Sequence, residues 1–234
     1  MDVMISVGNN FFYTKSLPCS LWFFDKAKAE AIRDKVLFID ARNYYTVVDR
    51  TLNEWTPWQL RNLNAIVWLH RGETEKYRKL LDEYRAALGT ELPFAECLQQ
   101  LTDELAGRRT DAKEAVASAE RKQKKQVQER LDVEIADLEA VLTVAKEAVW
   151  LTDKFGEGVY ADVPGLCKVA GIDEIEAKGW SLTPGAYVGV APDEGDGVDF
   201  HARMKEIHAE LLTLQARSNE LMETISRNMK EMGL

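Results

Sequence analysis

The chain has 234 residues, of which 46% are hydrophobic and 29% charged, and its formal net charge is −9. This composition supports one or two folded domains with a buried core and excludes a chain that is disordered throughout. The acidic balance argues against a protein that binds nucleic acid or a membrane over its whole surface, and it leaves room for local basic patches.

The cysteines and the apolar runs bear on the compartment. Cys19, Cys97 and Cys167 form neither a CxxC pair nor a zinc-binding pattern. A sparse, odd number of cysteines is typical of a reducing cytosol, so we expect a cytoplasmic protein. The longest apolar runs, 17–24 and 36–39, are far shorter than the roughly 20 residues that span a bilayer. No secretory signal is evident at the N-terminus.

Three apolar runs in the first forty residues predict β-strands, at 3–7, 17–24 and 36–39. The first run ends at Gly8-Asn9-Asn10, which is a turn signal. All three runs are nearly continuous rather than alternating, which predicts strands that are buried on both faces of a layered α/β sheet.

The period changes to a helical one at Thr56-Pro57, where proline stands at the first position of a helix. This helix is expected to continue to Gly72, a second to cover 73–88 before Gly89, and a third to cover 94–105 before Gly107. The following stretch, 110–150, contains neither glycine nor proline and predicts one long helix with an apolar stripe. That stripe needs a partner, and the candidates are the helices of 73–106 or another chain.

The last third of the chain falls into two parts. Residues 156–198 hold nine of the 14 glycines and predict loops with one short helix at 172–178. Residues 199–232 lack glycine and proline, and their apolar residues recur at heptad spacing, which predicts a coiled-coil helix. The apolar face of this helix, which we expect to dock on a partner protein, consists of Met204, Ile207, Leu211, Leu214, Leu221 and Ile225. The alternative is an ordinary helix packed on 110–150.

Motifs for catalysis or metal binding are absent from the sequence, which contains no GxSxG, HExxH or P-loop pattern. A basic segment offers Arg121, Lys122, Lys124 and Lys125 as candidate contacts to DNA phosphates. The alternative is the solvated tip of a long helix, because no aromatic residue interleaves with these cations. Phe12, within Phe11-Phe12-Tyr13, belongs either to the core or to a surface that stacks on a flat ligand.

Several blocks of sequence together resemble a known family. They are Asn10-Phe11-Phe12-Tyr13-Thr14, Leu17-Pro18-Cys19-Ser20-Leu21-Trp22-Phe23-Phe24-Asp25-Lys26, Val36-Leu37-Phe38-Ile39-Asp40-Ala41-Arg42, Tyr160-Ala161-Asp162-Val163-Pro164-Gly165-Leu166-Cys167-Lys168 and Gly179-Trp180-Ser181-Leu182-Thr183-Pro184-Gly185-Ala186-Tyr187-Val188-Gly189. In this order they resemble the C-terminal part of the modification subunit of type I restriction-modification systems. The resemblance covers 1–72 and 156–234, whereas 73–155 matches only as a variable helical insertion.

The resemblance implies an adenine-N6 DNA methyltransferase that uses S-adenosylmethionine. The family's glycine-rich cofactor loop and Asn-Pro-Pro-Phe tetrapeptide would lie upstream of this sequence, in which no proline follows Asn or Asp. We therefore expect a C-terminal fragment that is inactive alone, binds no S-adenosylmethionine, and docks through its last helix on the specificity subunit. The family also implies that Phe12 stacks on the flipped target adenine. It further implies that the chain contacts DNA as part of a complex with the specificity subunit.

These features predict a mainly α protein with a small N-terminal β part, the remnant of a Rossmann-like methyltransferase sheet. The expected divisions are 1–55 for the strands, 56–155 for the helices, 156–198 for the loops and 199–234 for the coiled-coil helix. A cut sheet would leave an open edge, so the isolated chain is expected to self-associate. The alternatives are a free-standing helical scaffold and an interaction module that contacts the DNA backbone.

Overall fold

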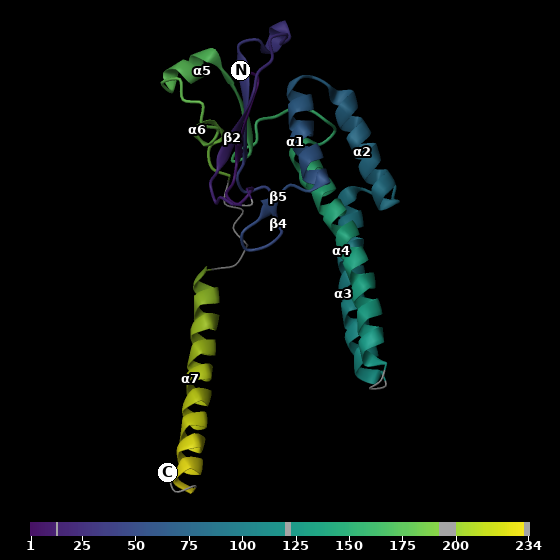
Figure 1. Cartoon of the computed structure of the whole chain (residues 1–234), viewed down its shortest axis with the longest axis vertical. Coiled ribbons are helices and arrows are strands. Elements are labelled where there is room, and N and C mark those ends of the chain that lie inside the picture. Colours follow the sequence, from purple (N-terminus) through teal and green to yellow (C-terminus); the bar gives the residue numbers. More distant parts are fainter. Residues whose placement is uncertain (13, 120–122, 192–199, 232–234) are drawn as a thin grey trace. The chain divides into compact units, whose positions relative to one another are not determined.

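The computed structural model describes residues 1–12, 14–119, 123–191 and 200–231, and it divides into two units, 1–191 and 192–234 (Figure 1). The first unit combines a small mixed sheet with helices, and the second contains one long helix. The expectation of a mainly helical protein with a small β part is confirmed. None of the described helices is long and apolar enough to cross a membrane.

The sheet has four strands in the order β2-β1-β3-β6. They are β1 (Val3–Val7), β2 (Cys19–Phe23), β3 (Lys35–Ala41) and β6 (Cys167–Gly171). β1 runs parallel to β3, while β2 and β6 are antiparallel to their neighbours. The sheet is therefore completed by a strand from the loop-rich segment, in which the sequence predicted no strand.

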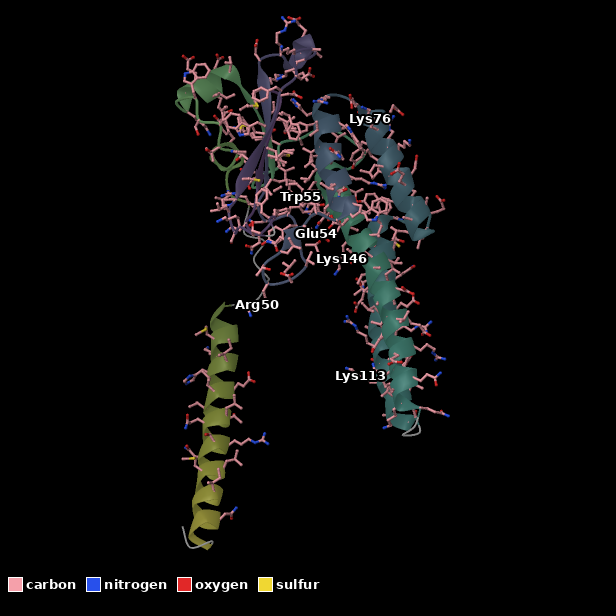
Figure 2. The ribbon with its side chains drawn as sticks, viewed as in Figure 1. Arg50, Glu54, Trp55, Lys76, Lys113 and Lys146 are labelled. Carbon is pink, nitrogen blue, oxygen red and sulfur yellow. The ribbon has the colours of Figure 1, made fainter. Side chains whose placement is uncertain are left out.

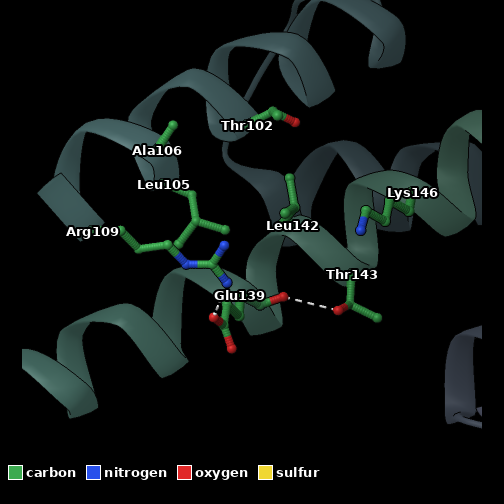
Figure 3. A pocket seen from close by; sticks show the side chains of 8 residues that line it. All are labelled: Thr102, Leu105, Ala106, Arg109, Glu139, Leu142, Thr143 and Lys146. Atoms are coloured by element: carbon green, nitrogen blue, oxygen red, sulfur yellow. Dashed lines mark hydrogen bonds and ion pairs between the residues drawn. The ribbon is translucent and has the colours of Figure 1, made fainter. Parts of the chain in front are cut away.

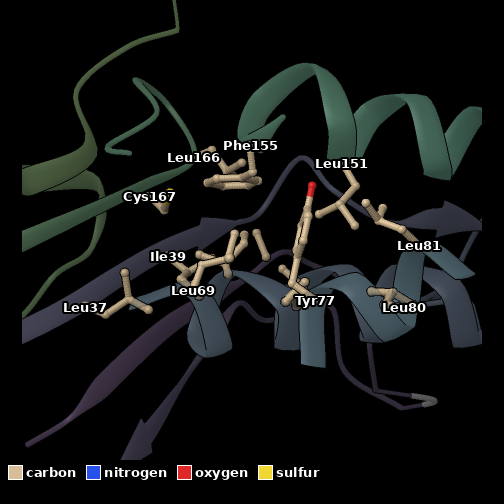
Figure 4. Close-up of a cluster of buried hydrophobic side chains, with 14 of the residues drawn as sticks. Leu37, Ile39, Leu69, Tyr77, Leu80, Leu81, Leu151, Phe155, Leu166 and Cys167 are labelled. Carbon is tan, nitrogen blue, oxygen red and sulfur yellow. The ribbon is translucent and has the colours of Figure 1, made fainter. Parts of the chain in front are cut away.

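The two central strands are buried because helices cover both faces of the sheet. Ile5 and Ile39 point into the larger core (Figure 4). This core also takes side chains from α1 (Pro57–His70), α2 (Thr74–Leu88) and the end of α4 (Lys124–Phe155). Met4 and Phe38 point to the other face, where α5 (Ile172–Ala177) and α6 (Gly185–Val188) lie. Alternate residues of one strand thus serve two cores, which explains the nearly continuous apolar runs.

Strand β2 differs from the prediction. Its apolar residues were expected to be buried on both faces, but Trp22 and Phe23 are about half exposed and Phe24, just beyond the strand, is 70% exposed. The prediction was wrong because β2 lies at the edge of the sheet, and the helices that bury β1 and β3 leave it uncovered among the described residues.

The first two helices begin and end as their sequence signals predict. In α1 (Pro57–His70) the Thr56 hydroxyl accepts from the Gln59 amide, and the Gln59 side chain accepts from the Thr56 amide, which forms a capping box. The helix α2 (Thr74–Leu88) ends at Gly89, which adopts the left-handed conformation. Both signals are local, since each acts within one turn of its helix end.

The next two helices form an antiparallel pair whose limits differ from the prediction. α3 (Phe94–Ser118) continues through Gly107, and α4 (Lys124–Phe155) begins only after the chain has reversed (Figure 1). The expected helix over 110–150 is thus the end of one helix and most of another. Leu105 and Ala112 of α3 are buried with Leu142 of α4, and this packing offsets the cost of a glycine inside a helix. The partner for the apolar stripe of α4 is therefore this chain itself.

Two glycines provide a matched test of these contacts. A Cβ at Gly8 would lie 2.6 Å from the Arg42 carbonyl oxygen, whereas a Cβ at Gly107 would meet no heavy atom within 4 Å. We expect Gly8→Ala to lower the free energy of unfolding by about 1–3 kcal/mol, and Gly107→Ala to raise it by about 0.5–1 kcal/mol. Urea denaturation of the two variants measures both changes, and a stabilising Gly8→Ala would contradict the close approach of β1 and β3.

Candidate functional site

The tandem aromatics after β1 separate into a packed ring and an exposed ring. Phe11 lies 4.9 Å from the ring of Trp55 and 6.0 Å from that of Tyr45. Phe12 is 48% exposed. The Lys15 amide donates to the Phe12 carbonyl at 3.2 Å, which closes a tight turn around this position. The sequence left core and surface positions open for this cluster, and the structure places Phe12 at the surface.

A surface hollow of about 410 Å³ lies beside the exposed ring. It is lined by Asn10, Phe12, Thr14, Lys15, Ser16, Arg50 and Thr51. The lining therefore combines one aromatic face with amide and hydroxyl groups and two cations, and it contains no acidic side chain. Aromatic faces next to cations are typical of sites that hold a nucleic-acid base and its phosphate.

The far side of this hollow is a two-stranded hairpin that the sequence did not predict. Its strands are β4 (Thr46–Val47) and β5 (Asn53–Glu54), and Figure 2 shows Arg50 at the outer end of the turn between them. Strands of two residues carry too little hydrophobic periodicity to be recognised. Pattern reasoning therefore missed both the hairpin and Arg50.

A buried asparagine ties the hairpin to the Phe12 loop. The Asn53 amide donates to the Asn10 carbonyl at 2.8 Å, and its side-chain Nδ2 donates to the Asn9 carbonyl at 2.9 Å. Asn53 itself is 7% exposed. Asn10 has a φ of 64°, a left-handed conformation that asparagine adopts more readily than most residues. The two walls of the hollow are thus held together by one main-chain hydrogen bond and by one from the buried side chain of Asn53.

The hairpin turn is fixed by its own side chains. Asp49 Oδ1 accepts from the Thr51 amide at 2.6 Å and from the Thr51 hydroxyl at 2.8 Å. These hydrogen bonds lower the pKa of the Asp49 carboxyl, so the group stays ionised at neutral pH. The backbone on both sides of Arg50 is therefore joined by hydrogen bonds, and the carboxylate next to Arg50 already accepts two of them.

The other candidate residues lie on helices. In α7 (Phe200–Glu231) the predicted docking residues are between 39% and 59% exposed. They are Met204, Ile207, Leu211, Leu214, Leu221 and Ile225. The stripe is uninterrupted by any helix break in the described residues, but Ser218 and Asn228 occupy two of its heptad positions. The spacing alone does not establish a coiled coil.

The basic segment lies where α3 and α4 meet. Arg121 and Lys122 lie outside the described residues, whereas Lys124 and Lys125 are exposed at the start of α4. Lys125 lies 3.7 Å from Glu129. Nearby arginines are also paired with acids, which reduces the positive charge available to a phosphate.

A groove of about 500 Å³ runs between the same two helices (Figure 3). Arg109 crosses it to Glu139 at 2.7 Å, and the Thr143 hydroxyl donates to the Glu139 carbonyl. The exposed ion pair occupies the polar side of the groove, and Leu105 and Leu142 close its floor. We interpret this groove as the seam of the helical pair.

One buried polar side chain, Asn62, forms its hydrogen bonds within the fold. Asn62 is fully buried and links three elements: its Nδ2 donates to Tyr44 Oη at 2.9 Å and to the Glu147 carbonyl at 3.1 Å, and its Oδ1 accepts from Tyr84 Oη at 2.9 Å. Burial is the main cause that raises the pKa of both tyrosines, so their hydroxyls remain neutral donors.

A second buried group, Asp2, joins the start of β1 to the end of α1. Its carboxylate pairs with Arg71 and lies 3.7 Å from the Lys28 ammonium. Burial lowers the pKa of the neighbouring His70, so its imidazole is neutral at pH 7. The buried carboxylate thus faces two cations, which is typical of a structural cluster.

The remaining candidates for a reactive group are Cys167 and clusters of metal-ligating side chains. Burial raises the pKa of the Cys167 thiol to about 11, which keeps it protonated and a poor nucleophile at neutral pH. No group of three or more His, Cys, Asp or Glu side chains among the described residues is placed to hold a metal ion.

Comparisons with known proteins show what the chain resembles. Residues 1–84 match the N-6 DNA Methylase family. The chain is 27% identical over 230 residues, 98% of its length, to the type I restriction enzyme MjaIX methylase subunit of Methanocaldococcus jannaschii. It is 40% identical over 74 residues, 32% of its length, to the type I restriction enzyme HindI methylase subunit of Haemophilus influenzae. The matched regions are 26% and 17% of these relatives, so the chain spans about a quarter of the length of the first.

Proposed function

Because the chain is related to the methylase subunits of type I restriction enzymes, we propose that it acts as one part of such a DNA adenine methylase. In this role it docks on the specificity subunit through α7 and reaches DNA through the complex. The observation that carries the proposal is the extent of the similarity. It covers 98% of the chain, so most of the exposed apolar stripe of α7 lies in the region shared with a methylase subunit.

The proposed division of labour follows from what the sequence contains. It lacks the Asn-Pro-Pro-Phe tetrapeptide and the glycine-rich cofactor loop, so the methyl-transfer chemistry and S-adenosylmethionine are supplied by a methylase region outside this sequence. Strands β2, β1 and β3 would then be the end of a Rossmann-like methyltransferase sheet. The exposed aromatic side chains of β2 support this assignment, because an uncovered apolar edge strand favours pairing with further strands.

Phe12 is the proposed contact to the target base. A base that has been flipped out of the duplex loses its stacking neighbours, and an exposed aromatic side chain replaces them. Phe12 meets this requirement because it is 48% exposed and because Phe11, rather than Phe12, fills the space against Trp55. The hollow beside Phe12 leaves room for a nucleotide.

The alternative function, a module that contacts the DNA backbone through its helical tip, is supported by the exposed Lys124 and Lys125. The ion pair between Lys125 and Glu129 and the pairing of Arg130 with Glu134 weaken it, because paired cations release fewer counterions from DNA. Docking on a protein subunit is therefore the function that the described surface favours.

The proposal is tested by co-expressing the chain with the specificity subunit encoded in the same genome. We expect the tagged specificity subunit to retain the chain through size-exclusion chromatography in 0.5–1 M salt, roughly the range in which interactions between exposed charges are screened. An apolar seam persists under these conditions because it does not depend on exposed charge. Complete separation of the two proteins at low salt would refute the docking role.

A further inference from the structure

We propose that the β4–β5 turn supplies a phosphate contact to the DNA strand whose base stacks on Phe12, with Arg50 as the principal cation and Lys15 as the second. The ligand class is a single-stranded or extrahelical deoxynucleotide with its backbone phosphate. This inference rests on the proposed function, since it extends the Phe12 site from the base to the strand that carries it.

The first observation is that Arg50 has no ion-pair partner among the described residues. Every other described arginine in residues 1–191 forms an ion pair with an acidic side chain. Arg50 forms none with a described residue, although Asp49 and Glu54 lie on the same hairpin and its side chain is exposed. An unpaired guanidinium in a chain with a net charge of −9 is available for an anion from outside.

The second observation is that both cations lie on the same hollow as the exposed ring. Lys15 follows Phe12 in a tight turn closed by the hydrogen bond between their main chains, and Arg50 reaches the hollow from the opposite wall. The acidic residue next to Arg50, Asp49, directs Oδ1 to the Thr51 amide and hydroxyl. A stacking surface with cations beside it is the arrangement that binds successive nucleotides of a single strand.

The third observation is that the two walls are already connected. The hydrogen bonds of Asn53 to the Asn9 and Asn10 carbonyls fix the hairpin relative to the Phe12 loop without a ligand. Because the turn is already held in place, it loses little conformational entropy when a strand binds. This favours a specific contact over a diffuse one.

The test uses the full chain and a short fluorescein-labelled oligodeoxyadenylate, with binding followed by anisotropy between 0.05 and 0.5 M salt, roughly the range over which phosphate contacts weaken. One phosphate contact to a single strand contributes a slope of about −0.7 in log K against log salt. We expect Arg50→Gln to make the slope less negative by about 0.7, because one phosphate contact is lost. We also expect it to weaken binding about fivefold in 0.1 M salt. Lys15→Gln should act in the same direction.

Two controls separate this inference from its neighbours. Lys79→Gln removes an exposed cation of α2 and should leave slope and affinity unchanged. Phe12→Ala should weaken binding of the oligodeoxyadenylate without changing the slope, and it should have no effect on an abasic oligonucleotide, which Arg50→Gln still weakens.

The outcomes are distinct. If Phe12→Ala weakens binding and Arg50→Gln leaves the slope unchanged, the phosphate contact is refuted and base stacking stands. If Arg50→Gln makes the slope less negative and Phe12→Ala leaves the affinity unchanged, the phosphate contact is supported and base stacking is refuted. Equal losses for Arg50→Gln and Lys79→Gln would refute a defined contact, and so would the absence of measurable binding by the unchanged chain.

Discussion

Aspartate at both Leu211 and Leu214 is expected to abolish binding of the chain to the specificity subunit. Both leucines are more than half exposed, and they lie three residues apart on the apolar stripe of α7. Full burial of a leucine contributes about 1.5–3 kcal/mol, so the loss of two weakens binding by at least about a hundredfold. The two buried carboxylates add a further desolvation cost. Co-purification with the tagged specificity subunit measures the loss.

A control variant matches this change in charge and spacing. Thr213→Asp with Ala216→Asp also places two aspartates three residues apart, but at about 100° per residue they lie on the opposite face of α7. This variant should still bind. The melting temperature of the Leu211→Asp, Leu214→Asp protein should equal that of the unchanged chain. A marked fall would show that α7 packs within the chain, and retained binding would refute docking through this stripe.

Asn62→Leu is expected to lower the free energy of unfolding by about 2–4 kcal/mol, since it strands buried polar groups. The fully buried Tyr84 would lose the acceptor of its hydroxyl, and Tyr44 and Glu147 would lose a donor. Leucine has the same number and branching of heavy side-chain atoms, so the change leaves no cavity and reports chiefly the loss of the hydrogen bonds. Urea denaturation followed by circular dichroism gives the difference.

The matched control is Asn64→Leu, because Asn64 lies on the same helix and is exposed. It should change the free energy of unfolding by less than about 0.5 kcal/mol. Equal values for the two variants would mean that the network joining α1, α2 and α4 contributes no stability beyond helix propensity.

Much of the helical part could be predicted because its signals are local. Thr56, Pro57 and Gly89 mark helix ends by interactions within one turn, and the structure places all three as expected. Gly107 misled the prediction, because packing between α3 and α4 decides whether a helix continues through a glycine. The sequence between α3 and α4 contains neither glycine nor proline, so no local signal marked the end of α3.

The sheet and the site were less predictable because they depend on distant partners. Burial of β1 and the exposure of β2 come from their places in the sheet, and both runs look alike in sequence. β6 was missed because Cys167–Gly171 becomes a strand only through pairing with β3. Phe12 was found through the family resemblance. Arg50, which faces it across the hollow, had no signal beyond its charge.

The pairing of β3 with β6 has a consequence for the order of folding. Ile39 is opposite Cys167, so this pair closes a loop that contains all four helices from α1 to α4. The contacts between α3 and α4 near their shared turn close only a short loop and therefore cost far less chain entropy. The pair of α3 and α4 is thus expected to form early and on its own. Strand β6 is expected to join the sheet last, after the intervening helices have brought it close to β3.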